Sequence, residues 1–340
     1  MLRRTSFFIV AAFLLLATAC APRQAINNVT SMATQFAPVA QQVLNAIASA
    51  SVSPARAGAP AAPSGAAPQV AAATPVTLNG APLALTRTAH ENIYVAPSTP
   101  NAFLQSVIAD AGTAAQRLMQ DEGWSGAPAV TIFVFPSRAV WLQGIEQIGG
   151  LPQSQVQFQA QLKGDAWVTI SGSGHPGIYI YPIQQSSFDM LHMLAHEYTH
   201  AIQRQVITDN TFVPDWFIEG MAEAEGWRIA GLTDPRAYAQ VHAQTVAFVR
   251  AAMRQRRLIP LSGIATQQAW QVHMESPRSA TLEYGEGQLA IEYLQRISGA
   301  NAPMRILQAT AAQHNFQAAF QQIAGETIPK FQAGLEASLR

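Results

Sequence analysis

All acidic residues of this 340-residue chain lie beyond residue 90, and this uneven distribution indicates which part of the chain can fold. Residues 1–90 contain no Asp or Glu, and the stretch from Cys20 to about residue 80 consists largely of Ala, Pro, Ser and Gly. Such a segment has too little apolar surface to offset the backbone entropy that folding would cost. We therefore expect a disordered tether over residues 20–80 and one folded domain over residues 81–340, which is long enough to bury a substantial core.

The charges and the cysteine count exclude several classes of protein. Lys and Arg total 20 and balance 20 Asp and Glu, so the chain lacks the basic excess that nucleic-acid-binding proteins carry, and we expect no nucleic-acid partner. Cys20 is the only cysteine, which excludes a disulfide framework, a Cys-ligated zinc site and a cysteine nucleophile in the folded domain.

The first 20 residues have the layout of a bacterial export signal. Two arginines precede an apolar run from Phe7 to Leu16, and small residues follow up to Cys20. A helix that spans a bilayer needs roughly 20 apolar residues, so a permanent transmembrane anchor is the weaker alternative for this shorter run. The segment Leu16–Cys20 resembles the bacterial lipobox, in which the Cys becomes the lipid-modified first residue of the mature chain, although Ala17 stands where Leu is commonest.

This resemblance implies a signal peptide over residues 1–19 and a mature protein that is attached to a membrane surface by acyl chains on Cys20. The alternative is an incidental cysteine beside an ordinary cleavage site. We expect a monomeric, exported protein that is lipid-anchored to the bacterial cell envelope, on its periplasmic or extracellular face.

Periodicity in the folded domain predicts an α+β protein. Strands rich in β-branched and aromatic residues are expected over residues 129–136, 165–172 and 177–182, the last two as a hairpin. Helices are expected over residues 100–121, 187–205, 215–230, 234–257, 282–297, 302–313, 315–323 and 327–339. Asp215 follows Pro214 and is the expected N-cap of its helix.

The helix over residues 187–205 contains the motif His196-Glu197-Tyr198-Thr199-His200. Residues four apart on a helix lie about 40° from each other on one face, so the two imidazoles can converge on one metal ion. Glu197 lies about 100° round the helix from His196, which places its carboxylate beside the metal rather than on it.

An acidic motif follows at a defined spacing. Eighteen residues separate His200 from Glu219, which lies in the segment PDWFIEGMAE (residues 214–223). This segment resembles the gluzincin metallopeptidases, in which a helix with a Glu-Gly-x-Ala pattern supplies the third zinc ligand. The spacing is similar to that of the aminopeptidase-N-like branch, and the Trp-x-x-Glu-Gly pattern to the peptidase MA-like families of secreted bacterial proteins.

The resemblance covers roughly residues 165–340 and implies a zincin-like α+β fold, with a small mixed β-sheet, an active-site helix and a helical C-terminal lobe. It also implies a zinc ion held by His196, His200 and Glu219, and an edge strand over residues 165–172 along which an extended substrate lies.

Two His and one Glu leave one open position on a tetrahedral zinc ion, which is the arrangement of catalytic zinc sites. Glu197 is then placed to act as general base toward water that the metal activates. Two alternatives stay open: the residues hold no metal, or the chain is a degenerate relative that keeps zinc without turnover. The intact Glu197 favours an enzyme over a non-catalytic zinc- or peptide-binding envelope lipoprotein.

Further side chains surround these residues. Glu223 is either an acceptor for a ring N–H of a liganding histidine or an exposed helix carboxylate. His192 lies about 12 Å along the helix from His200, too far to share one metal, and is predicted to be a packed or solvated residue. The resemblance implies an oxyanion donor from the later helices, for which Tyr284 is the candidate, a core tyrosine the alternative, and His273 the second choice.

These residues predict zinc-dependent hydrolysis of peptide bonds in extracytoplasmic proteins or peptides. Aminopeptidase-N-like enzymes carry a Gly-x-Met-Glu-Asn segment on the edge strand, whose carboxylate binds the substrate α-amine, and this chain has no such segment. Residues 166–172 contain no carboxylate, so we expect internal cleavage of an extended peptide that pairs with this strand, with Trp167 or nearby apolar residues selecting side chains. An acidic residue from elsewhere, Glu223 or Glu286, leaves the aminopeptidase alternative open.

Overall fold

The computed structural model describes residues 73–122, 128–161, 167–170, 174–207, 211–274 and 277–340, with only the backbone described at 121–122, 161, 271–274 and 277–280. Every described residue lies in one compact unit, Pro68–Arg340. The expected signal peptide, Cys20 and most of the tether therefore lie outside the described residues. Within the described part, no helix is both long and apolar enough to cross a membrane.

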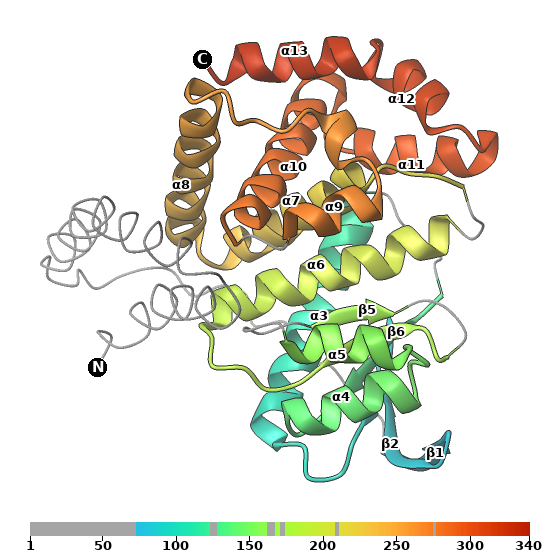
Figure 1. Cartoon of the computed structure of the whole chain (residues 1–340). Coiled ribbons are helices and arrows are strands. Elements are labelled where there is room, and N and C mark those ends of the chain that lie inside the picture. The colour runs from blue at the N-terminus through green and yellow to red at the C-terminus, as the bar shows by residue number, and fades with distance from the viewer. Residues whose placement is uncertain (1–72, 123–127, 162–166, 171–173, 208–210, 275–276) are drawn as a thin grey trace, which may run out of the picture. The chain divides into compact units, whose positions relative to one another are not determined.

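A mixed sheet of six strands forms the first part of the described unit, in the order β1-β2-β3-β4-β6-β5 (Figure 1). The strands are β1 (Thr74–Leu78), β2 (Ala81–Arg87), β3 (Glu91–Val95), β4 (Val130–Val134), β5 (Val168–Ile170) and β6 (Gly177–Ile180). The β3–β4 and β4–β6 pairs are parallel and the other neighbours are antiparallel. This mixed sheet, followed by a mostly helical region, confirms the predicted α+β fold class, and the β5–β6 pair confirms the predicted hairpin.

The sequence patterns do not predict the first three strands, although the sequence contains an Asn-Gly turn that joins β1 to β2. Asn79 and Gly80 have φ values of 48° and 82° and connect Leu78 to its partner Ala81. Positive φ at both central residues is the conformation of a two-residue hairpin turn, which Asn-Gly favours. The sheet therefore begins at Thr74, ahead of the boundary that composition places at residue 81.

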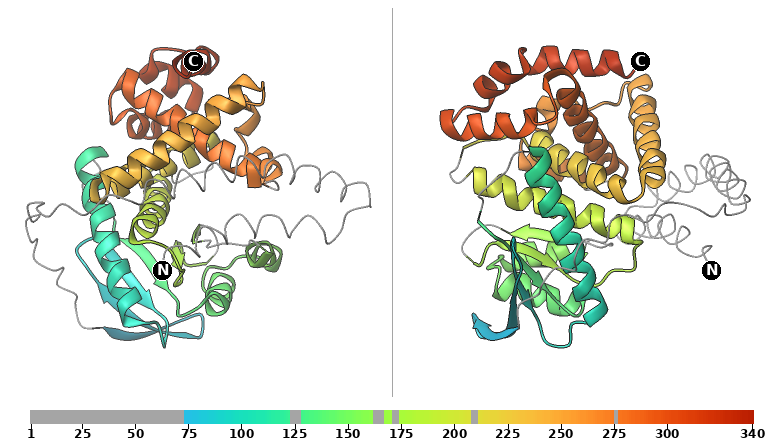
Figure 2. Two further views of the ribbon diagram at one scale, coloured as in Figure 1. Left: turned by 90° about the vertical axis from the view of Figure 1, so that its left-hand side faces the viewer. Right: turned by 180° about the vertical axis from the view of Figure 1, so that it is seen from behind.

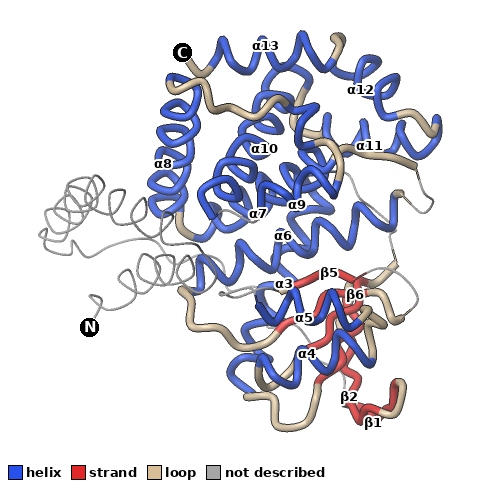
Figure 3. Tube along the Cα trace, viewed as in Figure 1, coloured by secondary structure: helices blue, strands red, loops and turns tan. Residues whose placement is uncertain are grey.

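Helices make up most of the remaining described chain (Figure 3). They are α3 (Asn101–Glu122), α4 (Arg138–Gln147), α5 (Gln153–Gln161), α6 (Ser187–Val206), α7 (Asp215–Thr233), α8 (Pro235–Arg254), the 3-10 helix η2 (Leu261–Ile264), α9 (Gln267–Met274), α10 (Pro277–Ser298), α11 (Ala302–Gln313), α12 (Phe316–Ala324) and α13 (Ile328–Ser338). The predicted helices are all confirmed, with boundaries within three residues except that α10 begins five residues earlier than predicted, whereas α4, α5 and α9 are additional to them.

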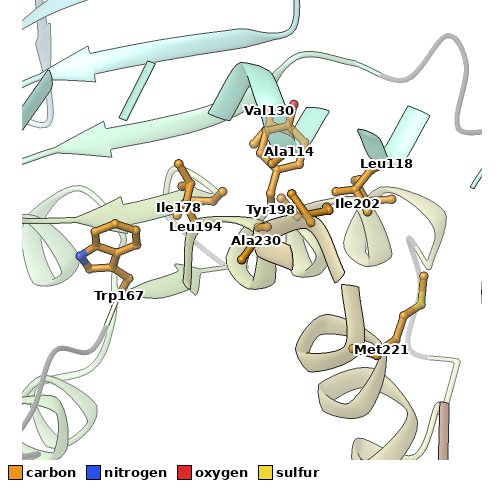
Figure 4. Packing of buried hydrophobic residues seen from close by; sticks show 14 of the residues in the cluster. Ala114, Leu118, Val130, Trp167, Ile178, Leu194, Tyr198, Ile202, Met221 and Ala230 are labelled. Atoms are coloured by element: carbon orange, nitrogen blue, oxygen red, sulfur yellow. The ribbon is translucent and has the colours of Figure 1, made fainter. Parts of the chain in front are cut away.

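Helix α6 lies between the sheet and the helical lobe (Figures 1 and 2). It contacts β4, β5, β6 and α3 on one side and packs along α7 on the other. Leu194, Tyr198 and Ile202 recur every four positions and are almost completely buried. Figure 4 shows Leu194 beside Ile178 and Tyr198 beside Val130, so this apolar stripe anchors α6 to the sheet.

Helix α7 packs between α6 and α10, and glycines allow both helices to come close. A Cβ atom on Gly220 would lie 2.5 Å from the carbonyl oxygen of Gly287 in α10. A Cβ atom on Gly226 would lie 2.9 Å from Cδ2 of His192 in α6. Since real Cβ atoms do not approach other atoms this closely, any larger residue at these positions would push α7 away from its neighbours.

Candidate metal centre

Helices α6 and α7 present complementary rows of side chains to each other. The row on α6 recurs every four residues on the face opposite the apolar stripe: His192, His196 and His200. The row on α7 recurs at the same interval: Asp215, Glu219 and Glu223. The two rows meet in opposite order, so that His192 faces Glu223 while Glu219 faces the other two histidines.

The three predicted metal ligands come together at the centre of these rows. The Nε2 atoms of His196 and His200 lie 3.1 Å apart, and Oε2 of Glu219 lies 3.6 Å and 3.3 Å from them, respectively. Ligand atoms around a tetrahedral zinc ion with bonds of about 2.0 to 2.1 Å are about 3.3 Å apart. The separations of the three protein atoms therefore fit such an ion.

A chain of hydrogen bonds fixes which nitrogen of His200 faces the cluster. The amide nitrogen of Gln203 donates to the carbonyl oxygen of Ile218 at 2.9 Å, so its Oε1 accepts from Nδ1 of His200 at 2.9 Å. With the proton on Nδ1, the lone pair on Nε2 is available to a metal. Gln203 is not among the predicted site residues, although a polar residue three positions after His200 lies on the same side of a helix.

Glu223 fixes the other histidine in the same way. Its Oε2 atom lies 3.1 Å from Nδ1 of His196. Burial raises the pKa of Glu223, but His192 and His196 lower it by more, and the pKa of this carboxyl is held well below its usual range. An ionised carboxylate only accepts hydrogen bonds, so Nδ1 of His196 donates and Nε2 is left for a metal. Of the two alternatives predicted for Glu223, the acceptor of a ring N–H describes its position.

The cluster strongly favours positive charge at its centre. Burial lowers the pKa of His196, but the hydrogen bonds and charges of Glu219 and Glu223 raise it to about 10. Burial likewise raises the pKa of Glu219, yet His200 and His196 lower it well below its usual range. Three atoms with lone pairs at 3.1 to 3.6 Å from one another need a proton or a cation between them. A divalent metal ion can replace that proton, so the donor set suits one.

Glu197 lies where α6 meets the edge of the sheet. The hydroxyl of Thr169 in β5 donates its one proton to Oε2 of Glu197 at 2.7 Å, and it also lies 3.0 Å from the backbone carbonyl oxygen of Glu197. In the described sheet β5 is the last strand, which confirms the predicted edge strand, although residues 165–166 and 171–172 of that prediction lie outside the described residues. The carboxylate of Glu197 is also close enough to raise the pKa of His196.

Trp167 does not line a surface along this strand, and the expectation that it selects substrate side chains is wrong. The residue is 5% exposed, and its indole nitrogen donates to the carbonyl oxygen of Tyr181 at 2.9 Å. Its ring packs edge-on against Phe103 of α3, at 6.4 Å between centroids. A large aromatic residue just before an edge strand is buried here because its ring packs against Phe103 of α3 in the hydrophobic core.

Tyr284 of α10 lies beside the cluster. Its ring centroid is 6.1 Å from that of His196 and 5.2 Å from that of Trp270. Burial and the three carboxylates of the site raise the pKa of Tyr284 well above its usual value, while a hydrogen bond with Trp270 opposes this. The hydroxyl therefore keeps its proton at neutral pH. His273, the second choice for this role, belongs to α9, but its side chain lies outside the described residues.

Asp215 extends the acidic row by one turn, and its expected role as N-cap is wrong. Pro214 precedes the first turn in extended conformation, and no side chain caps the helix. Burial and the neighbouring Glu219 raise the pKa of Asp215 to about 6, and His200 opposes the rise. A residue that caps its own helix would turn toward the backbone, whereas Asp215 belongs to the row that faces α6.

Comparison of the sequence with models of protein families gives no match, and comparison with curated proteins gives none either. The nature of the site therefore follows from its geometry. A mixed sheet is followed by helices, one of which carries an HExxH motif whose histidines meet a glutamate of the next helix, as in the zincin type of site. The described residues thus contain a His-His-Glu cluster that can hold a metal ion.

Proposed function

We propose that the protein is a zinc metallopeptidase of the gluzincin type, in which His196, His200 and Glu219 hold the metal and Glu197 is the general base. One observation carries the proposal: three ligand atoms from two helices lie within 3.6 Å of one another, beside the glutamate of an HExxH motif. Zinc is the ion for which a set of two His and one Glu, with one position open, is typical of catalysis.

The residues around the metal divide the chemistry between them. Zinc bound here would lower the pKa of a water molecule to about 7 and polarise the carbonyl group of the peptide bond. Glu197 takes a proton from the attacking water and passes it to the leaving amine. Thr169 holds the carboxylate of Glu197 next to the edge strand through the 2.7 Å hydrogen bond. Tyr284, which keeps its proton at neutral pH, donates to the oxyanion.

The proposed substrate is an extended peptide that pairs with the edge strand β5 and is cleaved internally. Residues 166–172 carry no carboxylate that could bind an α-amine. The two acidic residues that left the aminopeptidase alternative open are engaged elsewhere. Glu223 accepts hydrogen bonds from helix side chains at both of its oxygens, and Glu286 is 5% exposed and accepts from the backbone N–H of Ile259. This arrangement supports an endopeptidase.

The proposed setting of the reaction is the cell envelope. The lipobox-like segment that ends at Cys20 supports acylation of that cysteine and attachment of the mature chain to a membrane surface. The Ala- and Pro-rich residues that follow would act as a spacer between this anchor and the peptidase unit.

Metal content and proteolysis of the mature protein test the proposal. Wild-type protein should contain one zinc per chain and cleave casein, and a chelator should abolish cleavage. Glu197→Gln should keep the zinc and lose turnover because Glu197 is a base and not a ligand. His200→Ala should lose most of the metal. The control Glu146→Gln changes an exposed carboxylate of α4 and should leave both properties intact.

Three outcomes would contradict parts of the proposal. Full zinc retention in His200→Ala would remove the ligand assignment, and normal cleavage by Glu197→Gln would remove the general base. Zinc binding by wild-type protein without cleavage of casein or other unfolded proteins would favour the non-catalytic binding protein. For the mode of cleavage, peptides with free and acetylated N-termini are compared, and strict dependence on the free amine would overturn the endopeptidase.

A further inference from the structure

Glu223 has two hydrogen-bond partners besides His196. Its Oε2 atom lies 3.1 Å from Nδ1 of His196 and 3.2 Å from Nε2 of His192. Its Oε1 atom accepts from the indole nitrogen of Trp227 at 2.7 Å. Three ring N–H groups therefore converge on one carboxylate, and only one of them belongs to a predicted metal ligand.

The two additional rings also hold each other. The rings of His192 and Trp227 stack at 3.6 Å between centroids with an interplanar angle of 11°, and Phe188 packs against Trp227 at 5.5 Å. Gly226 makes this contact possible, because a Cβ atom there would meet Cδ2 of His192 at 2.9 Å. The side chains of His192 and Glu223 are 13% and 14% exposed, so water competes little for their hydrogen bond.

We propose that His192 and Trp227 are positioning residues of the metal centre, which act through Glu223. This inference rests on the proposed function, since it concerns the same metal site. With both oxygens fixed, the carboxylate of Glu223 cannot rotate away from Nδ1 of His196. The imidazole of His196 is then held with Nε2 toward His200, and the hydrogen bond from Nδ1 to a carboxylate makes Nε2 a stronger ligand.

A second metal ion between His192, His196 and Glu223 is the rival explanation, because their ligand atoms lie within 4.8 Å of one another. Occupation of both clusters would require His196 to bind one metal at each ring nitrogen and to lose both of its ring protons. A hydrogen-bonded carboxylate requires neither, since Nδ1 keeps its proton and donates it to Glu223. The number of zinc ions per chain separates the two explanations.

The test measures the zinc dissociation constant of the mature protein by competition with a chromophoric chelator. Glu223→Ala should weaken zinc binding by about ten- to a hundredfold, as is typical for a partner that orients a ligand. His192→Phe keeps a ring over Trp227 but loses the N–H donor, and should weaken binding by about three- to tenfold because other bonds to Glu223 remain. Trp227→Phe, which loses only the indole donor, should act in the same direction.

Two controls separate this role from a general loss of stability. His192→Gln supplies an amide N–H near the position of Nε2 and should restore most of the zinc affinity. His242→Phe removes another His–Glu contact, between His242 and Glu292 at 2.8 Å, and should leave zinc affinity unchanged. In the Glu223→Ala background, His192→Phe should change the dissociation constant by less than about twofold, because its effect passes through Glu223.

The outcomes distinguish this inference from the proposed function. Wild-type zinc affinity in both His192→Phe and Trp227→Phe would overturn the inference and leave the peptidase standing. An undiminished effect of His192→Phe in the Glu223→Ala background would also overturn it. Two zinc ions in wild-type protein, with one lost in His192→Phe, would establish the second metal site in its place. Wild-type protein that binds no zinc would overturn both proposals.

Discussion

At the scale of single residues, the two histidines of the cluster differ in what holds them. Nδ1 of His200 donates to the neutral amide of Gln203, whereas Nδ1 of His196 donates to the ionised carboxylate of Glu223. A carboxylate partner increases the basicity of the opposite ring nitrogen more than an amide does. His196 is therefore the stronger of the two candidate ligands, and its environment would contribute more to the retention of a metal.

The residue-scale prediction concerns Tyr284. Replacement of Tyr284 by Phe should lower kcat by about ten- to a thousandfold while the zinc content stays unchanged, because in the proposed mechanism the hydroxyl stabilises the oxyanion and does not bind the metal. Casein cleavage and elemental analysis check the two parts. Tyr94→Phe is the matched control, since Tyr94 lies on β3 and stacks on Phe133 in the sheet. An unchanged rate in Tyr284→Phe would make Tyr284 a core residue.

At the scale of elements, the position of Glu219 depends on how closely α7 approaches α10. The adjacent Gly220 meets Gly287 across this contact, so α7 cannot move outward without breaking it. The same helix carries the three acidic residues of the row that faces α6. The contact of α7 with α10 therefore sets the distance between the candidate ligand atoms on α6 and α7.

Gly220→Ala should destabilise the protein by about 1 to 3 kcal/mol and weaken zinc binding, because the new Cβ atom would lie 2.5 Å from the Gly287 carbonyl oxygen. Urea unfolding and the zinc dissociation constant measure these effects. Gly112→Ala in α3 is the control, since its Cβ atom would meet nothing within 4 Å and alanine favours the helix. Equal stability of the two variants would show that the α7–α10 contact tolerates a side chain.

The next prediction concerns how the stability of the protein depends on pH through a buried carboxyl group of α10. Burial raises the pKa of Glu286 from 4.5 to about 8. Glu283 and Glu336 add to this rise, and the hydrogen bond from the backbone N–H of Ile259 opposes it. Between these pH values the folded protein keeps a proton that the unfolded chain has lost, so stability falls as the pH rises. Glu286→Gln keeps an oxygen acceptor for Ile259 without this titration, and should be more stable than wild type at pH 8 but not at pH 4.5.

Urea midpoints at the two pH values check this prediction. The control Glu146→Gln changes an exposed carboxylate and should follow the wild-type pH dependence. If Glu286→Gln lost stability with pH as steeply as wild type does, Glu286 would not carry the effect.

At the scale of the whole molecule, the candidate site lies at the junction of two kinds of structure. Helix α6 is anchored to the sheet by its apolar face and meets α7 with its histidine face. Glu197 is held from the sheet by Thr169, and Glu219 is held from the helical lobe through α7. The sheet and the lobe must therefore both be folded for the candidate site to form.

The whole-molecule prediction concerns the N-terminus. Cells that express the full chain with a radioactive fatty acid should label the wild-type protein but not Cys20→Ser, because acylation needs the thiol. Fractionation should find the wild-type protein with membranes and the variant free of them. Equal labelling of the two proteins would exclude Cys20 as the lipid attachment site.

There are physical reasons why the sequence patterns do not predict β1, β2 and β3. The β1 strand contains Pro75, which lowers strand propensity, and it lies at the edge of the sheet, where a proline is tolerated. The first three strands also follow an Ala- and Pro-rich segment without a sharp change in composition. They form strands through their antiparallel pairing with one another and through the parallel pairing of β3 with β4.

The helices with long periodic patterns, the HExxH motif and the spacing to Glu219 could be read from the sequence, because each depends on positions along one helix or on a fixed interval. The contacts of Thr169, His192 and Trp227 could not, because only the packing of the helices and the sheet brings their partners together. Thr169 meets Glu197 across 28 positions, and His192 meets Glu223 across 31. The periodicity of α6 shows which way His192 points, but only the packing of α7, at a distance that Gly226 permits, shows what it meets there.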